Sequence, residues 1–125
     1  MRRTRIARVT PEELRQKLQA GGNVVVVDLR GAAEKSVDAV KLPGALQMSP
    51  DELQRRYTEI PADRDLVLYC SCPSEAAAAS LAIQLRQRGL TRVRPLLGGL
   101  DGWRARGYPL EPIQQTPANV ALASS

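Results

Sequence analysis

The stretch Leu66-Val67-Leu68-Tyr69-Cys70-Ser71-Cys72-Pro73-Ser74-Glu75 is the most informative part of the chain. Its first four residues predict a buried strand, and the alanine-rich segment that follows it predicts a helix. Cys70 therefore opens a tight loop, where backbone N–H groups and the positive end of a helix dipole lie close to the thiol. Both effects lower the pKa of a thiol, and the thiolate is the reactive form. Any chemistry of this chain is expected to start at Cys70.

The length and composition of the chain are those of one folded domain. The chain has 125 residues, of which 43% are hydrophobic, and this is enough for a single core. No apolar run reaches the roughly 18 residues of a spanning helix, and no signal-peptide core follows the basic start, so we expect no direct membrane insertion. We expect a flexible basic arm at 1–5, the domain at 6–110 and a disordered tail at 111–125. The expected location is the cytoplasm, for a separate protein or for the cytosolic domain of a larger membrane protein.

The formal net charge is +5, and Arg supplies fifteen of the eighteen positive charges. These residues are scattered, and the chain has no Phe, one Trp and three Tyr, so a platform on which bases could stack is missing. We therefore expect no nucleic-acid partner. The positive charge favours anionic small molecules or acidic partners instead.

Histidine is absent, and the two cysteines are separated by a single residue. The absence of His excludes Ser-His-Asp and Cys-His mechanisms and removes the commonest metal ligand. Two cysteines alone make a poor zinc site, so neither a metal nor a cofactor is expected. One Cys-x-Cys pair is no disulfide framework either, and a reducing compartment is the expected environment.

Strands are expected to alternate with helices along the chain. The expected strands are 6–9, 24–27, 45–47, 66–69 and 93–96, and the expected helices are one from Pro11 to the stop at Gly21 and others at about 32–38, 50–57, 74–88 and 101–106. This alternation indicates an α/β fold with a mainly parallel sheet, in which ligands bind beyond the carboxyl ends of the strands. Asp28-Leu29-Arg30, Cys70 and Gly98-Gly99 each follow a strand, so we expect them to meet at one edge.

Four short pieces of sequence carry a family resemblance. They are Val27-Asp28-Leu29-Arg30, Leu42-Pro43-Gly44-Ala45, Val67-Leu68-Tyr69-Cys70 and Gly98-Gly99-Leu100-Asp101-Gly102-Trp103. In this order and spacing, over about residues 6 to 110, the chain resembles the rhodanese (sulfurtransferase) domain. The resemblance implies a five-stranded, mainly parallel sheet flanked by helices on both faces, with Cys70 as the sulfur-carrying nucleophile.

The chain departs from the usual pattern of such domains at three positions. Lys41 stands where these domains often have a histidine, and Glu75 stands where they commonly have Arg or Lys. A second cysteine, Cys72, lies inside the loop. The Cys-x-Cys-Pro-x-Glu form resembles a rhodanese subgroup that includes domains appended to bacterial membrane proteins of the DedA type.

The resemblance implies sulfur transfer through a persulfide. The Cys70 thiolate would attack the sulfane sulfur of a small-molecule or protein persulfide donor, and a thiol acceptor or cyanide would then remove the outer sulfur. No proton shuttle is required, which suits a chain without histidine. Backbone N–H groups would form the cradle for the anionic sulfur, namely those of Ser71, Cys72, Ser74, Glu75 and Ala76. The Glu75 carboxylate near the loop mouth would repel thiosulfate and raise the pKa of Cys70, so weak thiosulfate activity is expected.

The remaining site residues have plainer interpretations. Cys72 is a small packing residue, a resolving thiol, a strained disulfide partner of Cys70 or, least favoured, a metal ligand. Asp28 and Arg30 are interpreted as a structural ion pair near the site. The glycine pair at 98–99 is interpreted as a close approach of backbone to the loop, and Trp103 as a core residue.

Other functions compete with the enzyme. A non-catalytic rhodanese-like module that binds or regulates a partner is favoured by Glu75 and disfavoured by the retained Cys70. A thiol redox protein would use Cys70 and Cys72. A cysteine phosphatase or arsenate reductase is disfavoured, because positions 71–79 contain no Arg or Lys to clamp an oxyanion.

Overall fold

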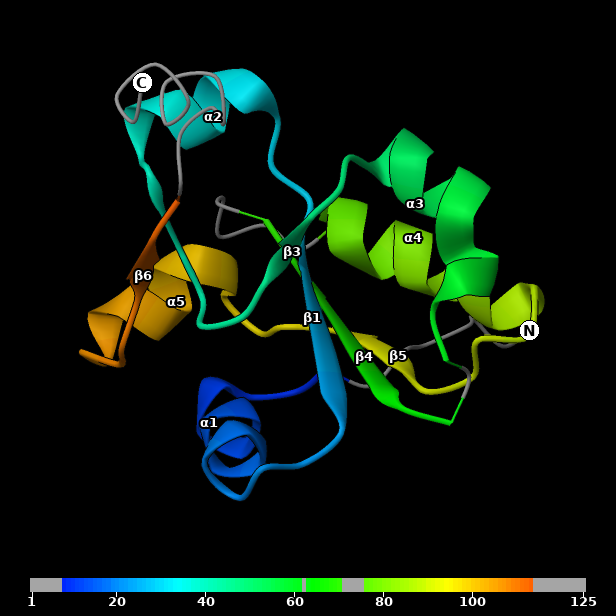
Figure 1. Cartoon of the computed structure of the whole chain (residues 1–125), viewed down its shortest axis with the longest axis horizontal. Helices are drawn as coiled ribbons and strands as arrows, with labels where there is room; N and C mark the ends of the chain where they lie inside the picture. The colour runs from blue at the N-terminus through cyan, green and yellow to red at the C-terminus, as the bar shows by residue number, and fades with distance from the viewer. Residues whose placement is uncertain (1–7, 62, 71–75, 114–125) are drawn as a thin grey trace, which may run out of the picture.

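The computed structural model describes residues 8–61, 63–70 and 76–113 of the chain (Figure 1). Its centre is a sheet of four parallel strands. In order across the sheet these strands are β3 (Leu46–Gln47), β1 (Val24–Asp28), β4 (Asp65–Tyr69) and β5 (Val93–Pro95). The two central strands pair along their whole length, from Val24 opposite Asp65 to Asp28 opposite Tyr69. The predicted α/β fold with a mainly parallel sheet is confirmed.

Among the described residues, Val9 alone represents the expected fifth strand. Val9 forms an isolated parallel bridge with Leu96, just beyond β5. Its N–H donates to the carbonyl of Pro95 at 2.9 Å, and its carbonyl accepts from the N–H of Leu97 at 2.8 Å. Because the helix that starts at Pro11 follows at once, the strand expected over 6–9 is one bridge wide among the described residues, and positions 6 and 7 lie outside them.

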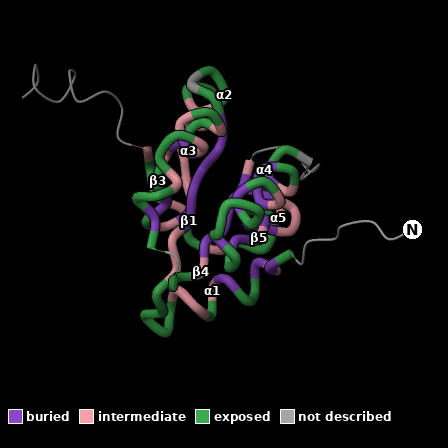
Figure 2. Tube along the Cα trace, turned by 90° about the vertical axis from the view of Figure 1, so that its right-hand side faces the viewer, coloured by how far each residue is buried: buried purple, intermediate pink, exposed green. Residues whose placement is uncertain are grey.

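Helices cover both faces of the sheet. One face carries α1 (Pro11–Gln19) and α5 (Gly99–Ala105), and the other carries α3 (Pro50–Arg56), its 3-10 extension (Tyr57–Glu59) and α4 (Ala76–Gln87). Successive residues of β4 alternate between the two cores, with Val67 and Tyr69 on the α1–α5 side and Leu66 and Leu68 on the α3–α4 side. Both central strands are buried over most of their length (Figure 2), and this explains why they are almost wholly apolar.

The helix starts expected from the sequence are present. Thr10 Oγ1 accepts from the N–H of Glu13 at 3.1 Å, and the Glu13 carboxylate accepts from the N–H of Thr10 at 2.9 Å, which completes a capping box. Ser49 caps α3 by accepting from the N–H of Glu52 at 3.1 Å. Among the described residues no helix is both long and apolar enough to cross a membrane.

A short helix and a second sheet lie at the side of the domain. After α2 (Ala32–Val37), β2 (Val40–Lys41) runs antiparallel to β6 (Glu111–Pro112), and the N–H of Ile113 donates to the carbonyl of Ala39 at 2.9 Å. The expected tail boundary at 111 is therefore corrected: its first residues form a strand, because β2 offers them a pairing partner. The remainder of the expected tail, 114–125, lies outside the described residues.

Candidate active site

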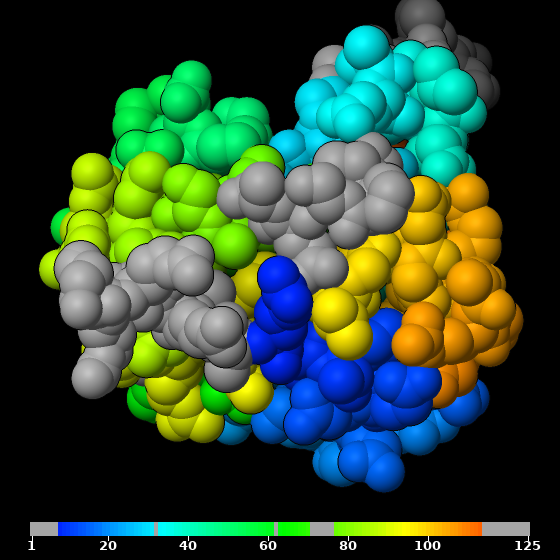
Figure 3. All heavy atoms as spheres, turned by 180° about the vertical axis from the view of Figure 1, so that it is seen from behind, coloured from blue at the N-terminus to red at the C-terminus, as the bar shows by residue number. Residues whose placement is uncertain are grey.

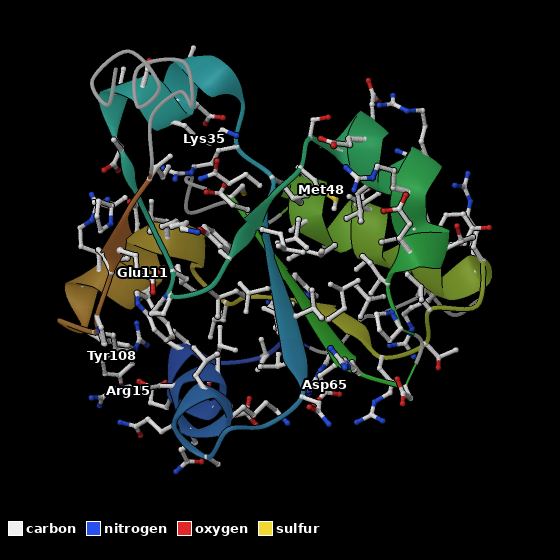
Figure 4. All side chains as sticks on the ribbon, in the orientation of Figure 1. Arg15, Lys35, Met48, Asp65, Tyr108 and Glu111 are labelled. Carbon is white, nitrogen blue, oxygen red and sulfur yellow. The ribbon has the colours of Figure 1, made fainter. Side chains whose placement is uncertain are left out.

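The carboxyl ends of the parallel strands bring three predicted segments to one edge of the sheet. Asp28 ends β1 and lies opposite Tyr69, the last residue of β4, so Cys70 follows directly beside this pair. The 98–99 glycine pair follows β5 on the other side of β4. Met48, which follows β3, donates its N–H to the carbonyl of Asp28 at 3.2 Å. In Figure 4 Met48 marks this edge, and Asp65 marks the opposite edge.

The main chain at Cys70 is held from both sides. The carbonyl of Cys70 accepts from the N–H of Leu100 at 2.9 Å, and the carbonyl of Tyr69 accepts from the N–H of Leu29 at 2.9 Å. Cys70 itself is half-buried. The end of β4 is thus bonded to the segment after β1 and to the first turn of α5, which fixes where the candidate nucleophile stands.

Of the five residues predicted to form the backbone cradle, the structure describes only the last, Ala76. Ala76 is the first residue of α4, so a helix begins within a few residues of Cys70, as the sequence predicts. The other four cradle positions, Ser71, Cys72, Ser74 and Glu75, lie outside the described residues, and with them the possible resolving thiol Cys72.

Asp28 and Arg30 form the expected ion pair, and both side chains are buried. Arg30 Nη2 lies 2.8 Å from Asp28 Oδ2, Arg30 Nε lies 3.0 Å from Oδ1, and the N–H of Arg30 donates to Oδ1 at 2.9 Å. Burial alone would lower the pKa of the guanidinium, but the hydrogen bonds and charge of Asp28 outweigh burial and raise it. The two side chains therefore form a bidentate ion pair, in which two guanidinium N–H groups donate to the two carboxylate oxygens.

The guanidinium of Arg30 also holds the main chain between α2 and β2. Its Nη1 donates to the carbonyl of Asp38 at 3.0 Å, and its Nη2 donates to the carbonyl of Val40 at 2.6 Å. The carboxylate of Asp38 pairs with Arg104 of α5 at 2.5 Å. These contacts hold the end of α2, whose body stands out from the domain in Figure 3 (cyan) and whose Val37 is 88% exposed.

Tyr69 is a site residue that the sequence analysis treated only as part of a strand. Its buried hydroxyl donates to Asp28 Oδ2 at 3.1 Å and accepts from the N–H of Leu42 at 3.2 Å. Burial, and then the charge of Asp28, raise the pKa of Tyr69 far above its ordinary value, so the hydroxyl stays protonated. The signal in the sequence is a tyrosine at the end of an otherwise aliphatic strand, since a buried tyrosine hydroxyl needs partners.

The turn at Leu42-Pro43-Gly44-Ala45 is built as the sequence predicts, with Gly44 at φ +72°. Lys41 Nζ donates to the carbonyl of Ala45 at 3.0 Å, and the N–H of Gly44 donates to the Glu111 carboxylate at 3.1 Å. Lys41, which departs from the family pattern, therefore closes the turn from one side while β6 closes it from the other.

The glycine pair after β5 makes a tight turn into α5. Gly98 and Gly99 have φ of +78° and +57°, where residues with a side chain are strained. A Cβ at Gly98 would lie 3.2 Å from the Cα of Gly102. This turn places the N–H of Leu100 on the Cys70 carbonyl. In the next turn of α5, Trp103 is fully buried and donates its Nε1–H to the carbonyl of Pro109 at 2.7 Å.

The fold and this arrangement agree with the comparison to known families. Residues 10–106 match the rhodanese-like domain. The chain belongs to the rhodanese-like domain family. Within the described residues no three Cys, Asp or Glu side chains gather closely enough to hold a metal ion, and the chain contains no His.

Relatives of this rhodanese-like domain include sulfurtransferases. A sulfurtransferase of Allochromatium vinosum is 36% identical over 102 residues, which cover 82% of this chain and 92% of that protein. The thiosulfate sulfurtransferase GlpE of Actinobacillus succinogenes is 30% identical, over 82% of this chain and 88% of its own length. The solved structure of the Alr3790 protein from Anabaena has a TM-score of 0.75 at 23% identity and covers 91% of this chain and 88% of that one, which supports the fold. Sulfurtransferase activity is therefore supported at the level of the family.

Proposed function

We propose that this chain is a sulfurtransferase in which Cys70 carries sulfane sulfur as a persulfide. The observation that carries the proposal is the position of Cys70: it follows β4 at the carboxyl edge of the sheet, and its carbonyl is fixed by Leu100. A helix, α4, begins a few residues later. Backbone N–H groups at such a strand-to-helix junction stabilise an anionic sulfur without moving during the reaction.

The reaction has two displacement steps. In the first, the Cys70 thiolate attacks the outer sulfur of the donor, the donor's S–S bond breaks, and the donor leaves as sulfite or a thiolate with the bonding electron pair. In the second, a thiolate or cyanide attacks the outer sulfur of the Cys70 persulfide, and the Cys70 thiolate leaves. No net oxidation occurs and no general base is needed, because both attacking groups are anions.

The preferred donor in this proposal is a small-molecule or protein persulfide. Glu75 places a carboxylate five residues after Cys70, where it disfavours the doubly charged thiosulfate through like-charge repulsion. The acceptor is a thiol. Such chemistry suits a reducing compartment such as the cytoplasm, and a domain of this subgroup can serve there alone or attached to a membrane protein.

Turnover of the purified chain tests the proposal. Sulfur transfer to cyanide is followed as thiocyanate, with thiosulfate and glutathione persulfide as donors, for the wild type, Cys70→Ser and Cys72→Ser. Cys70→Ser should abolish transfer from both donors. Cys72→Ser should retain it if Cys72 only fills space, whereas accumulation of a stable Cys70 persulfide would identify Cys72 as the resolving thiol. Full activity of Cys70→Ser would refute the proposal.

A further inference from the structure

The buried hydroxyl of Tyr69 joins three segments that meet beside Cys70. It donates to Asp28 at the end of β1, at 3.1 Å, and accepts from the N–H of Leu42 in the turn that follows β2, at 3.2 Å. Its own strand, β4, ends at this residue, and Cys70 comes next. Both partners are themselves buried. The hydroxyl is thus a fixed junction one residue from the candidate nucleophile.

The main chain at the end of β4 is bonded as well. The carbonyls of Tyr69 and Cys70 are bonded to the segment after β1 and to α5. Main-chain bonds of this kind fix how far the strand extends, but rotation of its last residue about the strand axis is restrained by the side chain. The ring of Tyr69 is packed in the α1–α5 core, and the hydroxyl adds to this restraint because it is bonded both to a carboxylate and to an N–H on separate segments.

The carboxylate that receives the hydroxyl bond is rigid. Asp28 is held by three bonds of 3.0 Å or less from the main chain and side chain of Arg30, and Arg30 is fixed in turn by the carbonyls of Asp38 and Val40. The charged groups that face the Tyr69 hydroxyl are therefore Asp28 and Arg30, which neutralise each other. The hydroxyl therefore fixes the relative positions of these segments and does not transfer a proton.

We propose that Tyr69 is a positioning residue for sulfur transfer: through its hydroxyl it holds the end of β4, and with it Cys70, in register with Asp28 and the turn at Leu42. The inference rests on the proposed role of Cys70 as the nucleophile. Loss of the hydroxyl leaves the Leu42 N–H without its acceptor in a buried place and lets the end of β4 shift. A misplacement of about 1 Å at a reacting group can cost on the order of a hundredfold in its rate.

The chain contains a matched control for this substitution. Tyr108 packs edge-on against Trp103 with ring centroids 5.1 Å apart, and Arg15 lies over its ring at 4.7 Å. It lies beside Arg15, away from the carboxyl edge of the sheet (Figure 4). Tyr108→Phe therefore removes a tyrosine hydroxyl from the same core without touching the contacts of Cys70.

The test is alkylation of Cys70 by iodoacetamide across a range of pH, with every variant made in a Cys72→Ser background so that the added mass in the mass spectrometer reports on Cys70 alone. Tyr69→Phe should displace the pH profile of Cys70 alkylation upward and so slow alkylation on the order of tenfold at neutral pH, because a thiol out of register with the start of α4 loses part of the stabilisation of its thiolate. The profile of Tyr108→Phe should superimpose on that of the wild type. Unfolding midpoints of both variants are measured alongside. A Tyr69→Phe protein that is destabilised but keeps the wild-type alkylation profile at Cys70 would overturn the inference, because the hydroxyl would then serve stability alone.

A second variant removes the donor of the hydrogen bond between Leu42 and Tyr69. Replacement of Leu42 by its α-hydroxy acid removes the N–H that donates to Tyr69 and leaves every side chain in place. It should change the Cys70 profile in the same direction as Tyr69→Phe, and an unchanged profile would contradict the inference even if Tyr69→Phe failed to fold. Alkylation needs only a thiol, so a Cys70 that responds to these variants but accepts no sulfur would refute the proposed function and leave the positioning role intact.

Discussion

The N–H of Leu100, in the first turn of α5, donates a hydrogen bond of 2.9 Å to the carbonyl of Cys70. This bond ties the candidate nucleophile to a residue that follows it thirty positions later in the chain. It depends on the left-handed turn at Gly98 and Gly99, which directs the N–H groups at the start of α5 toward the end of β4. The glycine pair is therefore part of the site through the main chain.

Gly98→Ala should damage both stability and the reactivity of Cys70. The new Cβ would be strained at φ +78° and would lie 3.2 Å from the Cα of Gly102, which is backbone and cannot move aside. We expect a loss of about 1–3 kcal/mol in the free energy of unfolding and slower alkylation of Cys70. Gly107→Ala is the matched control, since Gly107 has φ +72° and open space around its Cβ position. Equal effects of both variants on Cys70 would contradict the role given to the turn.

Arg30→Met should destabilise the domain by about 3–5 kcal/mol, because it leaves the buried carboxylate of Asp28 uncompensated. It also removes the donors that hold the carbonyls of Asp38 and Val40. Urea unfolding at neutral pH measures the difference. Arg55→Met serves as the control, because Arg55 is exposed, and should change stability by no more than about 0.5 kcal/mol. Similar midpoints for both variants would show that the ion pair adds little.

Glu75→Arg should raise turnover with thiosulfate more than turnover with glutathione persulfide. The substitution replaces a repelling carboxylate with a cation near the anionic donor. Asp63→Arg changes the net charge by the same amount from the opposite edge of the sheet, just before β4, and should have little effect on either donor. If Glu75→Arg leaves thiosulfate turnover unchanged, charge repulsion is not what limits that donor.

The ion pairs of Asp65 should make the free energy of unfolding depend on pH in the acid range. Its carboxylate lies 3.0 Å from Lys17 Nζ and 3.0 Å from Arg92 Nε, and the hydrogen bond from Lys17, followed by that from Arg92, lowers its pKa although burial acts the other way. Because the folded pKa is depressed, the stabilisation is fully present above the unfolded pKa of about 3.9 and is lost as the pH falls through the folded value.

Urea unfolding of the wild type and Asp65→Asn measures this contribution. The wild type should be more stable by a constant amount near pH 7, and the difference should shrink below about pH 4. A difference between wild type and Asp65→Asn that persists unchanged into strong acid would contradict the assignment.

Local patterns in the sequence predicted the frame of this fold. Four consecutive valines marked β1, and Thr10-Pro11 and Ser49-Pro50 marked two helix starts, because these signals depend on neighbouring residues only. The ion pair of Asp28 and Arg30 was predictable for the same reason, since the two residues are nearly adjacent.

The remaining features rest on contacts between distant residues. The hydroxyl of Tyr69 is hydrogen-bonded to Leu42 and to Asp28, which lie 27 and 41 positions away from it in the sequence. The carboxylate of Glu111 is hydrogen-bonded to Gly44, which lies 67 positions away. No local pattern marks such pairs, so the role of Tyr69 was missed and β6 was taken for a disordered tail. Of the strand expected over 6–9, the described residues contain the bridge at Val9, and positions 6 and 7 lie outside them.

Intact-protein mass spectrometry tests the central claim most directly. Wild type and Cys70→Ser are treated with glutathione persulfide or thiosulfate, and their masses are recorded before and after addition of cyanide. The account predicts that the wild type alone gains the mass of one sulfur atom, more completely from the persulfide, and that cyanide removes it. No gain from either donor, or an equal gain on Cys70→Ser, would contradict the claim that Cys70 carries sulfur, and a loss of two hydrogens would point to redox chemistry between Cys70 and Cys72 instead.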